Sequence, residues 1–236
     1  MKGREIRGLV VAAGSAAAFA ALLLFADPGA ERATALSQTV LARGVADTGA
    51  INIVAGVLLD YRGFDTLGEA SVIFASVAAV SAAFAGSVVP RTDAGLGLLV
   101  RRAVAYLAPL FLLFPAYIVL HGHLSPGGGF QGGVSLAVLL ILLTITFGTR
   151  RTAAAAGPGA LHTTEALSAG AFVLVGIVGI VGGASFLANL AAGFPPGVPG
   201  DLWSAGAIPL LNVIIGAKVA SGLGSIFYDL LSTRGS

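Results

Sequence analysis

The segment HGHLSPGGGFQGG, at residues 121–133, lies between two long apolar stretches of the chain. Its proline and its glycine cluster predict an irregular turn at the mouth of a membrane helix. Bilayer interiors tolerate irregular backbone only where protein or a water-filled cavity satisfies its polar groups. We therefore expect a closely packed turn that joins two membrane-spanning helices.

The composition of the whole chain predicts a polytopic membrane protein in a lipid bilayer. Charged residues make up 10% of the 236 residues and hydrophobic residues 56%, whereas soluble domains carry about 25% charged residues. The sequence has no cysteine, which excludes disulfides, thiolate metal sites and a cysteine nucleophile. The net charge of +2 reflects membrane topology and does not indicate nucleic-acid binding. Residues 127–133 lack the Lys-Ser/Thr of a P-loop, so we expect no cofactor.

Apolar runs of about 20 residues predict an all-α fold with about six spanning helices. A cleavable signal peptide is the alternative for the first run, although its length favours a retained helix. The apolar stretch 48–60 is too short to span and is expected to form a partial or surface-lying helix. The basic, Ala/Gly-rich stretch 149–164 is expected to be a flexible loop. The six predicted spans lie near residues 8–26, 66–88, 103–121, 132–148, 166–188 and 204–227.

The basic residues predict how the chain is oriented in the membrane. With both termini on one side, nine of the thirteen Lys and Arg residues lie on that side, three lie on the other, and Lys218 is inside a span. Because cytoplasmic loops carry the excess of basic residues, we expect both termini in the cytoplasm. The loops 27–65, 122–131 and 189–203 are then expected outside.

The segment DYRGFDTLGE, at residues 60–69, gathers three carboxylates and one guanidinium beside a predicted span. Asp65 and Glu69 are four residues apart, so they share one face of a helix. Carboxylates at the mouth of a span are costly unless they are paired or functional. Two interpretations stay open: an ion site, or a structural arrangement in which Thr66 and Glu69 form a capping box and Arg62 pairs with Asp65.

Two further titratable residues are candidates. His123 can titrate near physiological pH and relay a proton, or it can fix the glycine turn by a hydrogen bond; with three histidines in the chain, no metal site is expected. Lys218 lies inside a span and is a functional candidate, with snorkelling to the interface as the alternative. Glu165 is interpreted as a cap at a helix start. The candidate ion-pathway residues are Asp60, Asp65, Glu69, His123 and Lys218.

Both segments resemble motifs of one family. Residues 122–133 resemble the Gly-His-x-x-Pro-Gly-Gly-Gly-Phe-x-Gly-Gly stretch of the B-type component of the Mrp-type multisubunit sodium/proton antiporters. Residues 60–69 resemble a motif near the C-terminus of the large A-type component of those antiporters, which also occurs in the small E-type component of membrane-bound hydrogenases. The resemblance divides the chain into a two-span module, 1–90, and a four-span module, 98–231.

The resemblance implies a membrane subunit of a sodium/proton antiporter in the inner membrane of a prokaryotic cell, which is part of a transporter and not an enzyme. Its expected role is to line or gate the sodium route and to support assembly, with sodium ions, protons and components of the A, C, D, E, F and G types as partners. Alternatives are a sodium-translocating subunit of a hydrogenase-like respiratory complex and a structural adaptor. Glu69, His123, Pro126 and Phe130 match functional positions. The residues expected to shape the motifs are Arg62, Pro126, Gly127, Gly128, Gly129, Phe130, Gly132 and Gly133.

Overall fold

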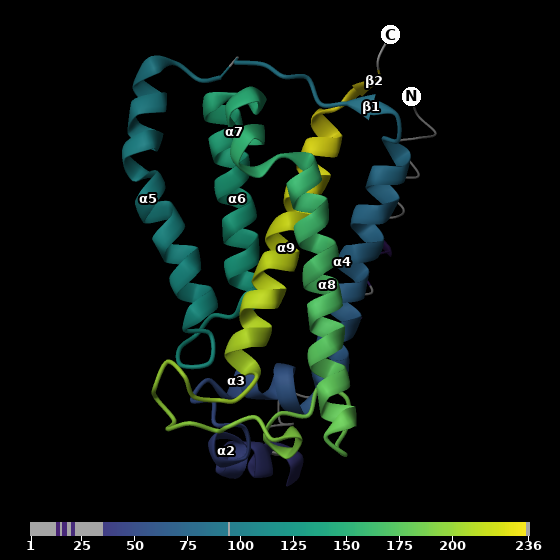
Figure 1. Cartoon of the computed structure of the whole chain (residues 1–236), viewed down its shortest axis with the longest axis vertical. Helices are drawn as coiled ribbons and strands as arrows, with labels where there is room; N and C mark the ends of the chain where they lie inside the picture. Colours follow the sequence, from purple (N-terminus) through teal and green to yellow (C-terminus); the bar gives the residue numbers. More distant parts are fainter. Residues whose placement is uncertain (1–12, 15, 18–19, 22–34, 94, 235–236) are drawn as a thin grey trace. The chain divides into compact units, whose positions relative to one another are not determined.

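Figure 1 shows the computed structural model, which describes residues 13–14, 16–17, 20–21, 35–93 and 95–234. The chain divides into two compact units, residues 1–39 and residues 40–236. The predicted first span, 8–26, lies outside the described residues except for a few positions. The second unit holds the helices that follow α2 (Ala35–Thr48).

Five helices within the described residues are long and apolar enough to cross a membrane, which confirms an all-α polytopic fold. The segment 149–181 satisfies this test as one continuous stretch, made of a short helix and a long one. Each of the five overlaps one apolar run of the sequence. The helices are α4 (Gly63–Ala83), α5 (Leu98–Leu120), α6 (Gly129–Phe147), α7 with α8 (Thr149–Ala156 and Pro158–Val181) and α9 (Ile208–Leu231).

The expectation of a flexible loop at 149–164 is wrong, because this stretch is almost entirely helical. α7 occupies its first half and α8 begins at Pro158. Alanine has the highest helix propensity, and proline is pre-organised for the first position of a helix. Hydrogen bonds also hold α7 in place: the Thr92 backbone N–H donates to Thr149 Oγ1 at 3.0 Å, and Tyr228 donates to Thr152 at 3.2 Å.

Helix α9 is the central helix of the second unit (Figure 1). It contacts α4, α5, α6 and α8, and 61% of its apolar window is buried, against 17% for α4 and for α5. Glycine permits this packing: a β-carbon at Gly133 of α6 would lie 2.7 Å from the carbonyl oxygen of Gly216. Close backbone approach through small residues is how membrane helices associate. The side chains of α9 therefore determine what chemistry the interior contains.

The connections between helices gather at two ends of the second unit. One, here named the loop end, comprises residues 48–62, 121–128 and 182–207, with the short helix η2 (Leu190–Ala192). The other, the strand end, comprises α7 and the antiparallel pair β1 (Ser87–Val88) and β2 (Thr233–Arg234). The described parts of the three loops predicted on one side of the membrane lie together at the loop end. The side of the membrane that this end faces stays a prediction.

Residues 53–61 form a short helix at the loop end. α3 (Ile53–Gly56) continues into the π-helix η1 (Val57–Tyr61), and the axis turns by 83° between Ser37–Thr48 and Ile53–Tyr61. Asn52 begins this helix, because its side-chain oxygen accepts hydrogen bonds from two backbone N–H groups of α3. Its amide nitrogen donates to Gly122 O at 2.7 Å and to Ser125 O at 3.0 Å. The short helix is thereby attached to the turn of the HGHLSPGGGFQGG segment.

Candidate functional site

Lys218 forms a buried ion pair in the interior of the helix bundle. Its Nζ lies 3.4 Å from Glu165 Oε1, and the two side chains are 3% and 5% exposed. Among the ion pairs of the described residues, this is the one with both partners buried. Charges at such depth are expensive and mark functional sites by default. Snorkelling of Lys218 to the interface is excluded, because the ammonium group points to a carboxylate inside the bundle.

The pairing also corrects the interpretation of Glu165 as a helix cap. α8 begins at Pro158, so Glu165 is a full turn or more inside the helix, where its backbone N–H is already bonded. The two partners are 53 residues apart in sequence and sit on different helices. Their pairing could not be seen in the sequence, where each charge was weighed by itself.

A cavity of about 190 Å³ adjoins the Lys218 side chain between α4, α8 and α9. The Lys218 ammonium lies 5.4 Å from the centre of the Phe74 ring, a cation–π distance. The aromatic face and the Glu165 carboxylate together stabilise the charge where water is scarce. The other side chains that line the cavity are mostly apolar: Leu67, Ala70, Ser71, Ala169, Phe172 and Val173.

The carboxylates of residues 60–69 lie apart from this pair. Arg62 and Asp65 form an ion pair, with side chains 66% and 46% exposed. Glu69 is exposed on α4, and none of the ion pairs within the described residues includes it. The capping-box interpretation is wrong: Thr66 is buried inside α4 and donates to Leu58 O at 2.6 Å. Glu69 is thus a carboxylate without a structural task inside the described part of the chain.

Asp60 lies on η1 at the loop end and accepts hydrogen bonds from Asn189. Asn189 is fully buried and also donates to Thr48 O and Ala205 O, while its oxygen accepts from the Ala207 backbone N–H at 2.7 Å. This asparagine connects the end of α2, η1 and the start of α9. Asp60 therefore belongs to the polar framework of the loop end and not to the surroundings of Lys218.

His123 is fully buried in the turn between α5 and α6. Its Nε2 lies 3.4 Å from Asp201 O, and its Nδ1 has no hydrogen-bond partner among the described residues. Burial lowers the pKa of His123, so the imidazole is neutral near pH 7. The described part of the chain holds no group of three or more His, Cys, Asp or Glu side chains that could bind a metal.

The glycine motif packs the start of α6 against α5 and α9. Gly128 has φ 139°, a conformation that side chains disfavour, and the Gly129 N–H donates to Asn212 Oδ1 of α9 at 3.0 Å. A β-carbon at Gly132 would collide with Val119. Phe130 packs against the apolar core, whereas Pro126 is exposed. The motif is therefore a junction of three helices.

Sequence reasoning missed Glu165, Asn189 and Asn212 as site residues. Asn52, Asn189 and Asn212 each hold backbone groups of segments far apart in the chain. The one available signal was their location beside Gly- and Pro-rich segments, because irregular backbone near a membrane needs polar side chains to satisfy it. For Glu165, the signal was a lone carboxylate in an Ala-rich, apolar stretch.

Comparison with known families agrees with both halves of the chain. Residues 99–225, more than half of the chain, match the family described as "Domain related to MnhB subunit of Na+/H+ antiporter". Residues 3–88 match the family of the E-type component of MBH. The two matches are consecutive, so a B-like module follows an E-like one in a single chain.

Two related proteins cover different shares of the chain. An uncharacterized protein of Methanocaldococcus jannaschii is 32% identical over 206 residues, 76% of each chain. The A/B component of a probable K(+)/H(+) antiporter of Rhizobium meliloti is 29% identical over 141 residues, which is 49% of this chain but only 14% of that one.

Two solved structures share the fold. A chain of the membrane-bound sulfane sulfur reductase, an archaeal respiratory membrane complex, has a TM-score of 0.78 and 29% identity, and the match covers 99% of this chain and 100% of that one. A chain of the Mrp complex from a Dietzia species has a TM-score of 0.73 and 24% identity, over 95% of this chain and 26% of that one.

Proposed function

The chain belongs to the family of domains related to the MnhB subunit of Na+/H+ antiporters, and from this premise we propose that it lies on the sodium route of such a complex. It is a membrane subunit of an antiporter-like complex or of a related respiratory complex. The finer assignment is that the chain lines or gates the route and supports assembly. In this role it is a transporter subunit that needs no cofactor.

The buried Lys218–Glu165 pair is the observation that carries this proposal. Two opposite charges inside an apolar bundle can change protonation or shift apart when a cation approaches, and so couple ion movement to proton movement. A purely structural bundle gains little from such a pair, because desolvation offsets the attraction between the charges. The pair is therefore more economically explained by ion transfer than by stability.

Glu69 is assigned to the same route at the surface of the chain. It is exposed on α4 and carries no helix-capping duty, since Thr66 bonds elsewhere. A carboxylate oxygen can replace part of the hydration shell of a cation. The chain alone offers Glu69 no counter-charge among the described residues, so the proposal places this carboxylate against a partner subunit, where the route continues.

The remaining assignments follow the two modules of the chain. Module 1–90 contributes Asp65 and Glu69, and module 98–231 contributes Lys218 and Glu165. Asp60 and His123 serve the loop-end framework through which the route would open. The proposed orientation keeps both termini in the cytoplasm, on the side of the strand end.

The test neutralises both members of the pair at once. Glu165→Gln with Lys218→Gln leaves no uncompensated buried charge, so the intact complex should assemble on a native gel. Sodium-driven proton movement in vesicles should fall at least tenfold. The matched control is the exposed pair Arg150–Asp93, 3.1 Å apart, neutralised in the same way, which should leave exchange unchanged. An assembled complex with the doubly neutral pair and full exchange would remove the pair from the route.

The respiratory alternative is supported by one observation, the full-length match to a chain of the sulfane sulfur reductase complex. The two candidates differ in their partners. Affinity purification of the chain from its native membrane, followed by mass spectrometry, should yield large antiporter-like subunits without iron–sulfur proteins under the antiporter assignment. Stoichiometric iron–sulfur partners would favour the respiratory complex.

A further inference from the structure

We propose that the Glu165–Lys218 pair exchanges protons with the strand end only, along a polar face of α9 that begins at a cavity near Asp229. The inference rests on the proposed function in treating the pair as an ion-transfer site, and it adds the route and its direction. The polar face of α9 is defined by Lys218, Ser221, Gly222, Ser225, Asp229 and Ser232.

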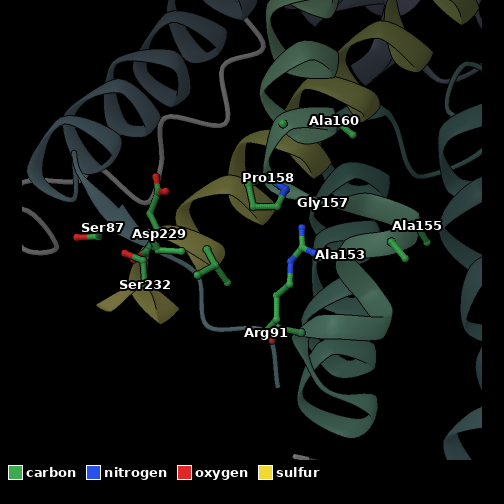
Figure 2. A pocket seen from close by; sticks show the side chains of 14 residues that line it. Ser87, Arg91, Ala153, Ala155, Gly157, Pro158, Ala160, Asp229 and Ser232 are labelled. Carbon is green, nitrogen blue, oxygen red and sulfur yellow. The ribbon is translucent and has the colours of Figure 1, made fainter. Parts of the chain in front are cut away.

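The route begins in a cavity of about 580 Å³ at the strand end. Figure 2 shows Asp229 and Ser232, from the end of α9, on one side of it and Arg91 and Ala153 on the other. Pro158, at the start of α8, also lines it. Polar groups and backbone ends of this kind hold water, so the cavity can supply protons to whichever acid borders it.

The next step from the cavity is a buried hydroxyl. Ser225 lies four residues before Asp229, one turn deeper on the same face of α9. Its side chain is 1% exposed, and its Oγ has no hydrogen-bond partner within the described residues. A buried hydroxyl left without a partner is costly, so its retention here fits a group that passes protons. Asp229 is held by Ser81, which donates to its Oδ2 at 2.6 Å.

The polar face meets the ion pair at Gly222. A β-carbon there would lie 3.8 Å from Glu165 Oε1 and 3.2 Å from Ile73 and Val77 of α4. The absence of a side chain keeps the space beside the carboxylate open. Gly222 is one turn from Ser225 and one turn from Lys218. The spacing along α9 therefore connects the cavity to the pair through two helical turns.

Towards the loop end, the same face of α9 is apolar. Ile215 and Leu211, three and seven residues before Lys218, are each 1% exposed and belong to the apolar core with Phe172. Neither of these two side chains can donate or accept a proton. The cavity beside Lys218, between α4 and α8, is lined mostly by apolar side chains. Access from the strand end alone follows from this asymmetry.

The proton transfer balances as a relay. A proton from cavity water protonates the Asp229 carboxylate. Asp229 then donates to Ser225, whose own hydroxyl proton moves to Glu165 Oε1, directly or through one water. Glu165 becomes a neutral acid, Lys218 keeps its ammonium proton, and the net change is one proton taken from the strand end. The reverse sequence returns it to the same side.

Thiol labelling in the assembled complex tests the direction of access. The chain has no cysteine, so single variants give a clean signal with a membrane-impermeant cationic methanethiosulfonate reagent. Ser225→Cys should react at least tenfold faster from the strand-end side than from the loop-end side. Ser232→Cys reports on the cavity. Leu211→Cys is the matched control, seven residues from Lys218 in the opposite direction and equally buried, and it should react from neither side.

Two outcomes would overturn the route. One is reaction of Ser225→Cys from the loop-end side at a similar rate; the other is an unreactive Ser225→Cys beside a reactive Ser232→Cys. A functional arm uses Ser225→Val, which should slow sodium-driven proton movement at least tenfold, and Ser225→Thr, which keeps the hydroxyl and should restore it. Full exchange in the valine variant would also contradict the route. Labelling does not depend on exchange, so a failure of the proposed function would be visible separately.

Discussion

The chain contains two acid–base pairs of similar chemistry in opposite surroundings. Lys218 and Glu165 pair on two helices in the interior, with side chains 3% and 5% exposed. Arg62 and Asp65 pair within one helix start, with side chains 66% and 46% exposed. The first pair is complete within this chain and must be satisfied there. The second, with Glu69 beside it, faces outward, where lipid or a partner subunit must satisfy it.

The difference shows that burial, and not charge count, separates the two roles. An exposed pair contributes about 0–1 kcal/mol to stability. Removing one partner of a buried pair leaves an uncompensated charge and costs about 3–5 kcal/mol. The interior pair is therefore sensitive to any single change, whereas the surface carboxylates can change without unfolding the chain.

The largest effect should come from breaking the interior pair. Glu165→Gln should lower the free energy of unfolding by about 3–5 kcal/mol, because the Lys218 charge loses its partner. Adding Lys218→Gln should recover most of that loss. A denaturing-detergent titration of the purified complex measures both. If Glu165→Gln alone costs less than about 1 kcal/mol, the magnitude of an exposed pair, the pair is solvated and the contrast with Arg62–Asp65 fails.

The second effect concerns function at the surface. Glu69→Gln should reduce sodium-driven proton movement in vesicles at least tenfold while the complex assembles normally, because the amide keeps the shape and removes the charge. Glu69→Asp keeps the charge with a shorter reach and should retain partial activity. A native gel controls for assembly. Full exchange by the glutamine variant in an intact complex would leave Glu69 as an outward-facing group without a part in transport.

A smaller effect should follow from pH at the loop end. The pKa of His123 is lowered by burial below its usual value of about 6.5. The unfolded chain then binds more protons than the folded one below about pH 6.5, so stability is full above that pH and falls as the pH drops through the folded pKa. The melting temperature of the wild-type complex should fall between about pH 7.5 and 5.5, and that of His123→Gln should fall less. Equal slopes would show that His123 is not the titrating group.

The smallest effect should come from the exposed pair. Arg62→Gln should change the free energy of unfolding by about 0–1 kcal/mol, because solvent screens the interaction with Asp65. The same titration that measures Glu165→Gln serves here, with Arg43→Gln, from another exposed pair, as the control. A loss comparable to that of the interior pair would mean that the start of α4 is buried by a partner in the complex.

Most of the membrane fold could be predicted from local sequence. Runs of about 20 apolar residues predicted the five described spans, because the thickness of the bilayer fixes the length of a helix. The turn at residues 121–133 and the grouping of loops at one end follow from the same alternation of apolar and polar segments. The prediction failed at 149–164, where the helix propensity of alanine mattered more than the flexibility suggested by its glycines.

The sequence by itself determined the class of protein, the order of its helices and the family, because hydrophobic length and short motifs are local properties. Only the tertiary structure decided which charges meet. Glu165 and Lys218 lie 53 residues apart and pair because α8 and α9 pack side by side. Thr66 bonds Leu58 O, which freed Glu69 from the helix cap. Helix packing sets these partners, since the desolvation of a charge depends on every segment around it.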